Sequence, residues 1–442
     1  MTRLAYTALW WCALPFLPLR LWWRGRREPL YRARMGERFG RYAGAARVVG
    51  NDVLWIHAVS LGETRAIAPL VERLVRGDPR RTIVLTHMTA TGRAAGSALF
   101  GNRVVQAWLP YDVPFAVHRF LAHFHPRAGL LVETELWPNL AAAAARAGVP
   151  LLLVNARLSA RSAHGYARIA GLSRPLLESL AGVAAQSPED AERLRSLGAR
   201  NVVVTGNVKF DVVIPDAMRE RGRALRARFG TRRPVLLLAS TREGEEALLL
   251  DALARARVPP PTLVVIVPRH PQRFDAVAAL LAARGLAYAR RSAEPAVPDD
   301  VSIVLGDTMG EMLAYYAACD VAFVGGSLLP LGGQNLIEPI ALGVATLIGP
   351  HTFNFAQASD AAVAAGAAQR VANADTMFAA AATLLDDPAA RARMRENAQA
   401  FIAAHRGAID RLWSWLAPWI AAQGARDPIP ATGDSPPRGP PR

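Results

Sequence analysis

The sequence predicts an α/β protein of two doubly wound domains, each a parallel sheet with helices on both faces. Short apolar runs typical of buried strands alternate with longer helix-like stretches, which is the pattern of a parallel sheet covered on both sides. A charged stretch at residues 210–233 has few strand-like runs, and a second alternating series follows it. The 442 residues are enough for two domains that each bury a core.

The chain begins with an apolar segment that is followed by arginines. Residues 4–19 are apolar except for Thr7, and Arg20 precedes a cluster of arginines at positions 24, 26 and 27. A spanning helix needs about 20 apolar residues, so this one suffices only if Arg20 extends toward the lipid headgroups. A helix that lies on the bilayer surface is the alternative. In both cases the arginines predict that residues 1–27 anchor the protein at the cytoplasmic face of a membrane.

The first domain is expected at residues 28–220 and the second at residues 221–424. Strands are expected at residues 53–59, 82–88, 104–109, 129–133, 151–155, 183–186 and 202–205, and then at 235–239, 263–267, 301–305, 321–324 and 345–348. Residues 404–423 predict an amphipathic helix with three tryptophans, whose spacing favours packing against the other domain. Residues 425–442 are rich in Pro, Gly, Asp and Arg and are expected to be disordered.

Composition and charge exclude several classes of protein. Two cysteines form neither a disulfide framework nor a four-thiolate metal site, so a reducing compartment is expected. The 52 Lys and Arg against 36 Asp and Glu give a net charge of +16. The motifs of nucleic-acid-binding proteins are absent from the sequence, so no nucleic-acid partner is expected. An anionic membrane surface or a phosphorylated substrate accounts better for the positive charge.

One basic residue stands apart from the others. Of the 52 Lys and Arg residues, 51 are Arg and one is Lys209. A compositional bias replaces lysine wherever arginine serves equally well, but not where a compact ammonium on a flexible stem is needed. Lys209 also follows the last expected strand of the first domain, at the junction. A cation there suits a developing negative charge such as a departing phosphate. An ion pair with Asp211 is the alternative, although an arginine would serve there as well.

Sites in doubly wound sheets lie at the carboxyl ends of the strands, and carboxylates occur at two such positions in the first domain. Glu63 follows the strand at 53–59 and a glycine turn, in the first turn of a helix. It is either a helix-capping carboxylate or a general base. Glu133 and Glu135 follow the strand at 129–133. At most one of them, with Glu133 nearer the strand end, is expected to enter the site, while the other caps the next helix.

The second domain is expected to bind a nucleotide. Glycine-rich residues 325–333 follow a strand and precede a helix start, and glycines let backbone N–H groups approach phosphate. Glu338 lies about one turn further on, where it can accept hydrogen bonds from a ribose. Three other polar loops, at residues 240–245, 268–271 and 306–311, follow strands of the same series. The sequence has no Asp-x-Asp metal clamp and no Gly-x-Ser-x-Gly elbow. These patterns favour a metal-free transfer from a nucleotide-linked donor.

Taken together, the motifs resemble those of the Kdo transferases (3-deoxy-D-manno-octulosonic acid transferases) of Gram-negative lipopolysaccharide biosynthesis. The segments that carry the resemblance are WIHAVSLGE (55–63), ETELWPN (133–139), NARLS (155–159), GNVKFD (206–211), ASTR (239–242), VPRHP (267–271), GDTMGE (306–311) and residues 325–355. The match extends from the N-terminal segment to about residue 410. Gln334 and Ile337 depart from the family pattern, in which His or Asn, and Pro, are expected.

The resemblance implies a GT-B glycosyltransferase, with two Rossmann-like domains facing across a cleft, on the cytoplasmic side of the inner membrane. It implies transfer of Kdo from CMP-Kdo to lipid IVA, a lipid A precursor, with Glu63 as general base and with Glu133 and Lys209 stabilising the transition state. The residues that it assigns to CMP are Pro268, Arg269, Met309, Gly310, Glu311, Asn335, Leu336, Ile337 and Glu338. No metal or other cofactor is expected, because departing CMP carries a single phosphate. The basic residues 24–41 are expected to dock the phosphorylated acceptor at the anionic membrane surface.

Two other functions remain as alternatives at this point. A GT-B enzyme that uses a UDP-sugar, or a sugar-nucleotide epimerase, would share the glycine-rich loop and Glu338. A nucleotide-binding membrane scaffold without turnover is the third hypothesis. The carboxylates and the lysine at three strand ends count against the scaffold.

Overall fold

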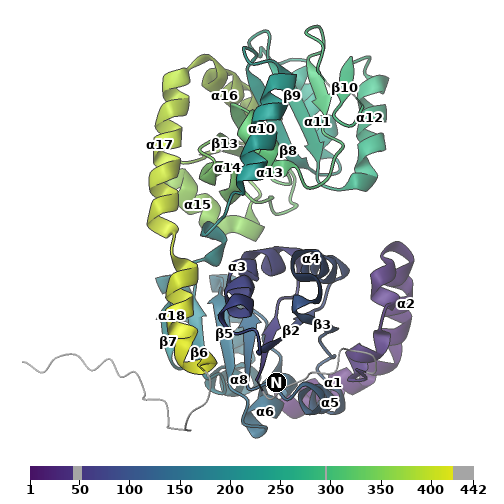
Figure 1. Ribbon diagram of the computed structural model, residues 1–442, viewed down its shortest axis with the longest axis vertical. Coiled ribbons are helices and arrows are strands. Elements are labelled where there is room, and N and C mark those ends of the chain that lie inside the picture. Colours follow the sequence, from purple (N-terminus) through teal and green to yellow (C-terminus); the bar gives the residue numbers. More distant parts are fainter. Residues whose placement is uncertain (43–51, 294–295, 422–442) are drawn as a thin grey trace, which may run out of the picture. The chain divides into compact units, whose positions relative to one another are not determined.

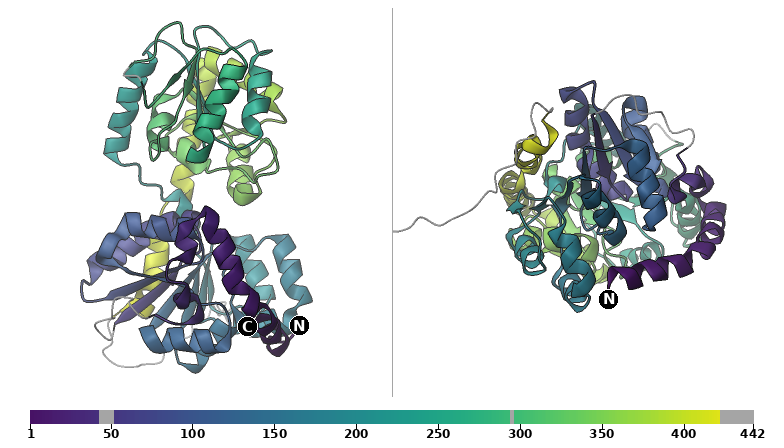
Figure 2. Two further views of the ribbon diagram at one scale, coloured as in Figure 1. Left: turned by 90° about the vertical axis from the view of Figure 1, so that its right-hand side faces the viewer. Right: turned by 90° about the horizontal axis from the view of Figure 1, so that it is seen from below.

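The computed structural model describes residues 1–42, 52–293 and 296–421. The expectation for the tail at 425–442 lies outside these residues. Unit 1 comprises Met1–Val208 and the described residues from Gly407 onward, and unit 2 comprises Lys209–Arg406 (Figure 1). Each unit is a parallel sheet with helices on both faces, as the alternating sequence pattern predicts (Figure 2).

The sheet of unit 1 has its first strand in the interior, as the third of seven. The strands are β1 (Val53–His57), β2 (Thr82–His87), β3 (Val105–Trp108), β4 (Ala128–Val132), β5 (Leu151–Ala156), β6 (Gly182–Ala185) and β7 (Val202–Val204). Their order is β3-β2-β1-β4-β5-β6-β7, and all pairs are parallel. The direction of winding reverses between β1 and β4, so the loops after these two strands diverge and leave a crevice at the carboxyl edge.

Helices cover both faces of this sheet. They are α1 (Arg3–Ala13), α2 (Leu17–Arg27), α3 (Leu61–Gly77), α4 (Ala90–Phe100), α5 (Pro114–Phe124), α6 (Pro138–Arg146), α7 (Ala160–Arg168), α8 (Ala170–Glu178), α9 (Pro188–Ser196) and α18 (Ala408–Ile420), with 3-10 turns at η1 (Leu14–Phe16), η2 (Pro29–Arg32), η3 (Met35–Phe39) and η4 (Gly101–Arg103). Alternate residues of β1 face opposite layers: Trp55 packs with Phe120 of α5, whereas Ile56 packs with Ile67 of α3 and Leu412 of α18. The strands are apolar on both sides for this reason.

The sheet of unit 2 is also parallel and seven-stranded, but its fourth strand lies between its second and third. Its strands are β8 (Val235–Thr241), β9 (Leu263–Pro268), β10 (Tyr288–Arg290), β11 (Ile303–Leu305), β12 (Val321–Val324), β13 (Ala345–Ile348) and β14 (Gln369–Arg370), in the order β10-β11-β9-β8-β12-β13-β14. The helices are α10 (Asp216–Phe229), α11 (Glu245–Leu253), α12 (Phe274–Ala283), α13 (Met312–Ala318), α14 (Ile337–Ala341), α15 (Ala356–Ala364), α16 (Ala374–Asp386) and α17 (Pro388–His405), with η5 (Val208–Phe210), η6 (Pro271–Arg273) and η7 (Phe353–Phe355). Here the winding reverses between β8 and β12.

The structure places the domain boundaries differently from the expected 220/221 and 424. Residues 209–220 belong to unit 2, because Phe210 packs against Phe401 and His405 of α17. From Gly407 the chain belongs to unit 1 again, because Leu412 and Leu416 of α18 are buried in its core. The packing predicted for the tryptophan-containing helix against the other domain is thereby confirmed.

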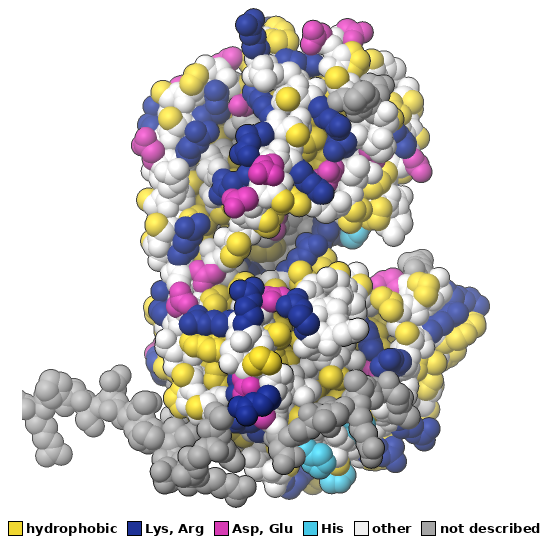
Figure 3. All heavy atoms as spheres, in the orientation of Figure 1, with side chains coloured by type: hydrophobic (Ala, Val, Ile, Leu, Met, Phe, Trp, Pro, Cys, Tyr) yellow, Lys and Arg dark blue, Asp and Glu magenta, His cyan; other side chains and the backbone are white. Residues whose placement is uncertain are grey.

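The N-terminal segment is helical and packs against unit 1 on one side. Residues Arg3–Arg24 are long and apolar enough to cross a membrane, by length and composition alone. Leu17 and Leu21 are buried among residues of unit 1, and the hydroxyl of Thr7 donates to Asn139 Oδ1 at 3.0 Å. The opposite side exposes seven large apolar residues: Leu4, Leu9, Trp11, Phe16, Leu19, Trp22 and Trp23. Hydrophobic and basic side chains consequently lie together along the edge of unit 1 that α2 forms (Figure 3).

Candidate active site

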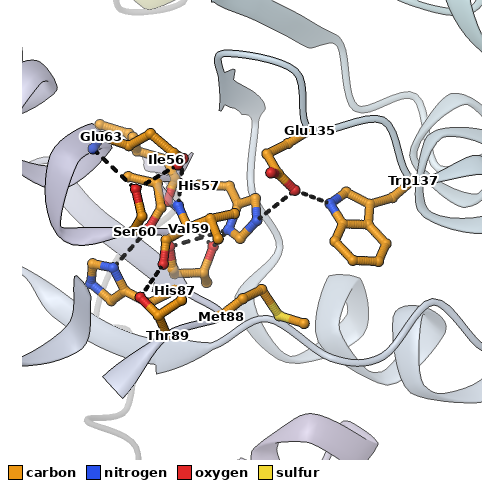
Figure 4. Close-up of polar contacts among 12 residues, drawn as sticks. Ile56, His57, Val59, Ser60, Glu63, His87, Met88, Thr89, Glu135 and Trp137 are labelled. Carbon is orange, nitrogen blue, oxygen red and sulfur yellow. Dashed lines mark hydrogen bonds and ion pairs between the residues drawn. The ribbon is translucent and has the colours of Figure 1, made fainter. Parts of the chain in front are cut away.

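Glu63 lies in the first turn of α3, which follows the loop that leaves β1 (Figure 4). Ser60 is the N-cap: its Oγ accepts the N–H of Glu63 at 3.3 Å and donates to Glu63 Oε1 at 2.7 Å. The N–H of Val59 donates to Glu63 Oε2 at 2.7 Å. Two donors and the helix N-terminus complement a negative charge at this position, and 9% of the residue is exposed. Glu63 is therefore a helix-capping residue by geometry.

Two neutral histidines lie at the strand ends next to the loop that leads to Glu63. His57 ends β1 and His87 ends β2, and both are fully buried. Burial, and to a smaller extent the neighbouring His87, lower the pKa of His57 to about 3. Burial likewise lowers the pKa of His87 to about 4. At neutral pH these side chains are uncharged and act only through hydrogen bonds.

Glu133 begins the loop after β4 with a left-handed backbone. Its φ is 65°, which is uncommon for a residue with a side chain, while its N–H still donates to Val154 O at 2.9 Å. The strand therefore ends at Val132, and the left-handed backbone of Glu133 turns the chain at the carboxyl end of β4. Such strained positions occur at functional sites, and Asn155 of β5 and Ser240 of β8 share the feature.

The expectation for Glu135 as a helix cap is wrong. The N-cap of α6 is Trp137, and the side chain that satisfies its first turn is Asp112, which accepts the N–H groups of Asn139 at 2.9 Å and Leu140 at 2.8 Å. Instead, Glu135 Oε2 accepts the indole N–H of Trp137 at 3.0 Å and lies 4.0 Å from His57 Nε2 (Figure 4). Residues two apart in a strand share a face, and here the turn at Glu133 brings both carboxyls to the same loop. Sequence reasoning missed Glu135, although its spacing was the available signal.

Lys209 lies in η5, where unit 1 ends and unit 2 begins. The segment is attached to unit 1 by the N–H of Val208, which donates to Asn155 Oδ1 at 3.1 Å. Asn155 is fully buried and has a φ of 51°, so the end of β5 sets the position of the segment. Within unit 2 the ammonium of Lys209 lies 5.5 Å from the centre of the Phe355 ring.

Arg269 follows β9 in unit 2, next to the glycine-rich loop. Its Nε donates to Gln334 Oε1 at 3.1 Å, so Gln334 orients the guanidinium. Glu245 of α11 is fully buried and organises the loop itself, because it accepts the N–H groups of Gly326 at 2.6 Å and Leu328 at 3.0 Å. Pro268 is the last residue of β9. Sequence reasoning noted Gln334 only as a departure from the family pattern and did not foresee its contact with Arg269.

The remaining residues expected to hold CMP also lie in loops at strand ends of unit 2. Asn335 donates to Glu338 Oε1 and accepts the N–H of Ile337, both at 3.0 Å, which sets the start of α14 beside Leu336. Glu311 Oε2 accepts the hydroxyl of Thr308, and its other oxygen lies 3.3 Å from Arg291. In the same turn Met309 is exposed, and Gly310 has a φ of 80°.

The structure thus brings Glu63, Glu133 and Glu135 together at the carboxyl edge of the unit 1 sheet. Arg269 lies beside the glycine-rich loop at the corresponding edge in unit 2. The described ranges contain no group of three or more His, Cys, Asp or Glu side chains placed to hold a metal ion.

Comparison with known proteins identifies the family. Residues 33–212 match the model of a protein family that is described as 3-deoxy-D-manno-octulosonic-acid transferase (kdotransferase). The chain is 49% identical to the 3-deoxy-D-manno-octulosonic acid transferase of Bordetella pertussis over 95% of its own length and all of the relative's. The chain belongs to the Kdo transferase family. The enzyme of Haemophilus influenzae is 35% identical, over 95% of this chain and 99% of that one.

A Kdo transferase is a glycosyltransferase of lipopolysaccharide biosynthesis, and the fold agrees with that assignment. A glycosyltransferase from Rickettsia africae aligns with a TM-score of 0.55 at 12% identity, over 84% of this chain and 98% of that one. The UDP-GlcNAc 2-epimerase of Neisseria meningitidis aligns with a TM-score of 0.56 at 16% identity, over 82% of this chain and all of that one. At these identities the likeness shows the GT-B fold alone.

Proposed function

We propose that this Kdo transferase transfers Kdo from CMP-Kdo to lipid IVA without a metal ion, with Glu63 as the general base. The observation that carries the proposal is the carboxyl group of Glu63, held by Ser60 and by the N–H of Val59 beside the winding reversal of the unit 1 sheet. Glu63 accepts the proton of the acceptor hydroxyl, whose oxygen bonds to the anomeric carbon of Kdo. The bond from that carbon to the CMP phosphate oxygen breaks, and its electron pair leaves with CMP.

The charges of the transition state match two further residues. Positive charge develops on the sugar ring, and the carboxylate of Glu133 stabilises it. Negative charge develops on the departing phosphate, and the ammonium of Lys209 offsets it. Arg269, held by Gln334, supplies a second cation for the same phosphate. In this proposal unit 2 binds CMP through its strand-end loops, and two cations replace a metal.

The product of the reaction tests the proposal. Membranes that carry the full-length protein are incubated with lipid IVA and CMP-Kdo, and the lipid is analysed by mass spectrometry. Mass additions of one or more Kdo units are expected, and they count the sugars transferred. They should be unaffected by EDTA. Addition of a hexose from a UDP-sugar, or a requirement for divalent metal, would contradict the proposal.

We further propose that the N-terminal helix and its arginines hold the enzyme on the cytoplasmic side of the inner membrane. The support is the exposed apolar side of α1 and α2 beside exposed arginines, of which Arg26, Arg32 and Arg41 are three. Arg26 and Arg32 both stack on Trp22. Anionic headgroups attract such arginines, and the exposed tryptophans suit the membrane interface.

Binding to vesicles should depend on these arginines. Replacing Arg26, Arg32 and Arg41 with glutamine is expected to weaken binding to phosphatidylglycerol vesicles by about fivefold per residue, because each contributes about 1 kcal/mol. Raising the salt concentration should weaken wild-type binding as well. The matched control replaces three exposed arginines of α10 (Arg219, Arg221 and Arg223). Equal losses in both triple variants, or binding that ignores salt, would disprove the electrostatic contribution.

A further inference from the structure

The protonation state of His57 can be worked out from its contacts. Nδ1 lies 3.1 Å from the carbonyl oxygen of Thr86, which can only accept a hydrogen bond, and 2.9 Å from Thr86 Oγ1. The hydroxyl of Thr86 donates to Ile56 O at 3.4 Å, so both Thr86 oxygens accept from His57 and Nδ1 carries the proton. Burial lowers the pKa of the ring to about 3, so the ring has no second proton. Nε2 is therefore unprotonated and can only accept a hydrogen bond. None of the described residues donates a hydrogen bond to it. A buried acceptor of this kind needs a donor.

Glu135 is the polar side chain that faces this lone pair. Its Oε2 lies 4.0 Å from Nε2, which is longer than a hydrogen bond. The contact is not an ion pair, because His57 is neutral. An ionised Glu135 could not bond to Nε2, because a carboxylate and an unprotonated ring nitrogen are both hydrogen-bond acceptors. A protonated Glu135 would supply the missing donor.

We propose that Glu135 is a neutral carboxylic acid whose O–H donates to His57 Nε2, and that it is a positioning residue for Glu63. The hydrogen bond connects the loop after β4 to the end of β1. Because Glu135 is neutral, it adds no second negative charge near Glu63. The proposal rests on the proposed role of Glu63 as base. It goes beyond that role in assigning a proton to a second carboxyl of the same site.

The charges around Glu135 are consistent with this assignment. Burial raises the pKa of Glu135 to about 7, with the negative charges of Glu63 and Glu133 acting in the same direction. The indole N–H of Trp137 opposes them, because it stabilises the carboxylate. From α7, Tyr166 also faces this carboxyl, and burial together with the charge of Glu135 raises the pKa of its phenol, so it is neutral as well.

Ionisation of Glu135 then has two consequences for the enzyme. The hydrogen bond to His57 is lost, and a second negative charge appears beside Glu63, where the anionic donor and acceptor must bind. Both effects lower kcat/KM as the pH rises above about 7. Because one proton is involved, the fall approaches about tenfold per pH unit.

Stability gives a readout that needs no substrate. The pKa of Glu135 is raised from 4.5 to about 7 in the folded protein, so the folded state holds the proton more tightly. Its contribution to stability is complete below pH 4.5 and is lost as the pH rises through 7. The two buried histidines have the opposite pH dependence, but they cancel when wild type is compared with a Glu135 variant.

The test compares wild type with Glu135→Gln, in which the amide N–H₂ replaces the acid as donor. In full-length protein in detergent, the Tm of wild type relative to Glu135→Gln is expected to fall between pH 5 and pH 8. The variant should keep kcat/KM within about threefold of wild type at pH 6.5 and lose the alkaline decline. Glu189→Gln, an exposed carboxylate of α9, is the control and should change neither curve.

Trp137→Phe provides a second, independent variant. It removes the N–H that stabilises the carboxylate, so the alkaline decline is expected to move to higher pH.

A Glu135→Gln variant that folds but is inactive at every pH would show that the carboxylate form is needed, and would overturn the proposal. So would a Tm difference independent of pH. A pH-dependent Tm difference combined with unchanged transfer by Glu63→Gln would instead uphold the proton on Glu135 and refute Glu63 as base.

Discussion

Replacing Glu63 with glutamine is expected to lower kcat for Kdo transfer by about 10²–10⁴-fold, the usual contribution of a general base. Glutamine can keep the capping arrangement, because its amide accepts the N–H of Val59 and donates to Ser60 Oγ. It cannot accept the proton of the acceptor hydroxyl. The variant therefore separates the two roles that the geometry gives Glu63. Single-turnover transfer to lipid IVA, with CMP binding measured by calorimetry, is the measurement.

Glu63→Ala is the companion variant, because it removes the cap together with the carboxylate. It is expected to lose a similar amount of activity and, in addition, about 1 kcal/mol of stability. If Glu63→Gln transferred Kdo at the wild-type rate while Glu63→Ala was unstable, Glu63 would be a cap and nothing more. Unchanged CMP binding in both variants would show that unit 2 is intact.

Replacing Lys209 with alanine is expected to lower kcat by about 10²–10³-fold, with a smaller effect on KM, because the ammonium acts on charge that develops in the transition state. Lys209→Arg should recover only part of this loss. A guanidinium spreads its charge over a rigid plane, whereas the ammonium is a compact charge on a flexible stem. The chain has 51 arginines and a single lysine, so the comparison of Lys209 with arginine asks why this position alone has kept a lysine.

Arg219→Ala, an exposed cation of α10, is the matched control for Lys209 and should leave kcat unchanged. Steady-state kinetics with CMP-Kdo and lipid IVA provide the comparison. Full activity in Lys209→Arg would mean that any cation suffices there. Full activity in Lys209→Ala would remove Lys209 from the mechanism.

Most of the fold could be predicted from the sequence because buried parallel strands have a strong local signal. All twelve expected strands are present, since each is an apolar run and most are covered on both faces; β7, at the edge of its sheet, is only partly buried. The two missed strands, β10 and β14, are three and two residues long and lie at the edges of their sheet. An edge strand pairs on one side only and needs few apolar residues, so its pattern is weak.

The position of the candidate site could be predicted as well, because loops at the carboxyl ends of parallel strands are identifiable once the strands are known. Glu133 and Arg269 follow β4 and β9 directly, and Glu63 lies in the first turn of the helix after β1. The pairing of Gln334 with Arg269 could not be predicted. These residues are 65 positions apart, and the contact depends on β9 and the glycine-rich loop meeting at one edge of the sheet.

By itself, the sequence determined the fold class, the family and the strand ends that carry the chemistry, because these depend on local patterns and on motifs of a few residues. Only the tertiary structure decided that α18 completes the core of unit 1 and that Glu135 faces His57. Whether a carboxyl is a cap, a base or a neutral acid depends on its burial and on the charges around it. Those neighbours come from β1, β2 and α7, and folding brings them together from distant parts of the chain.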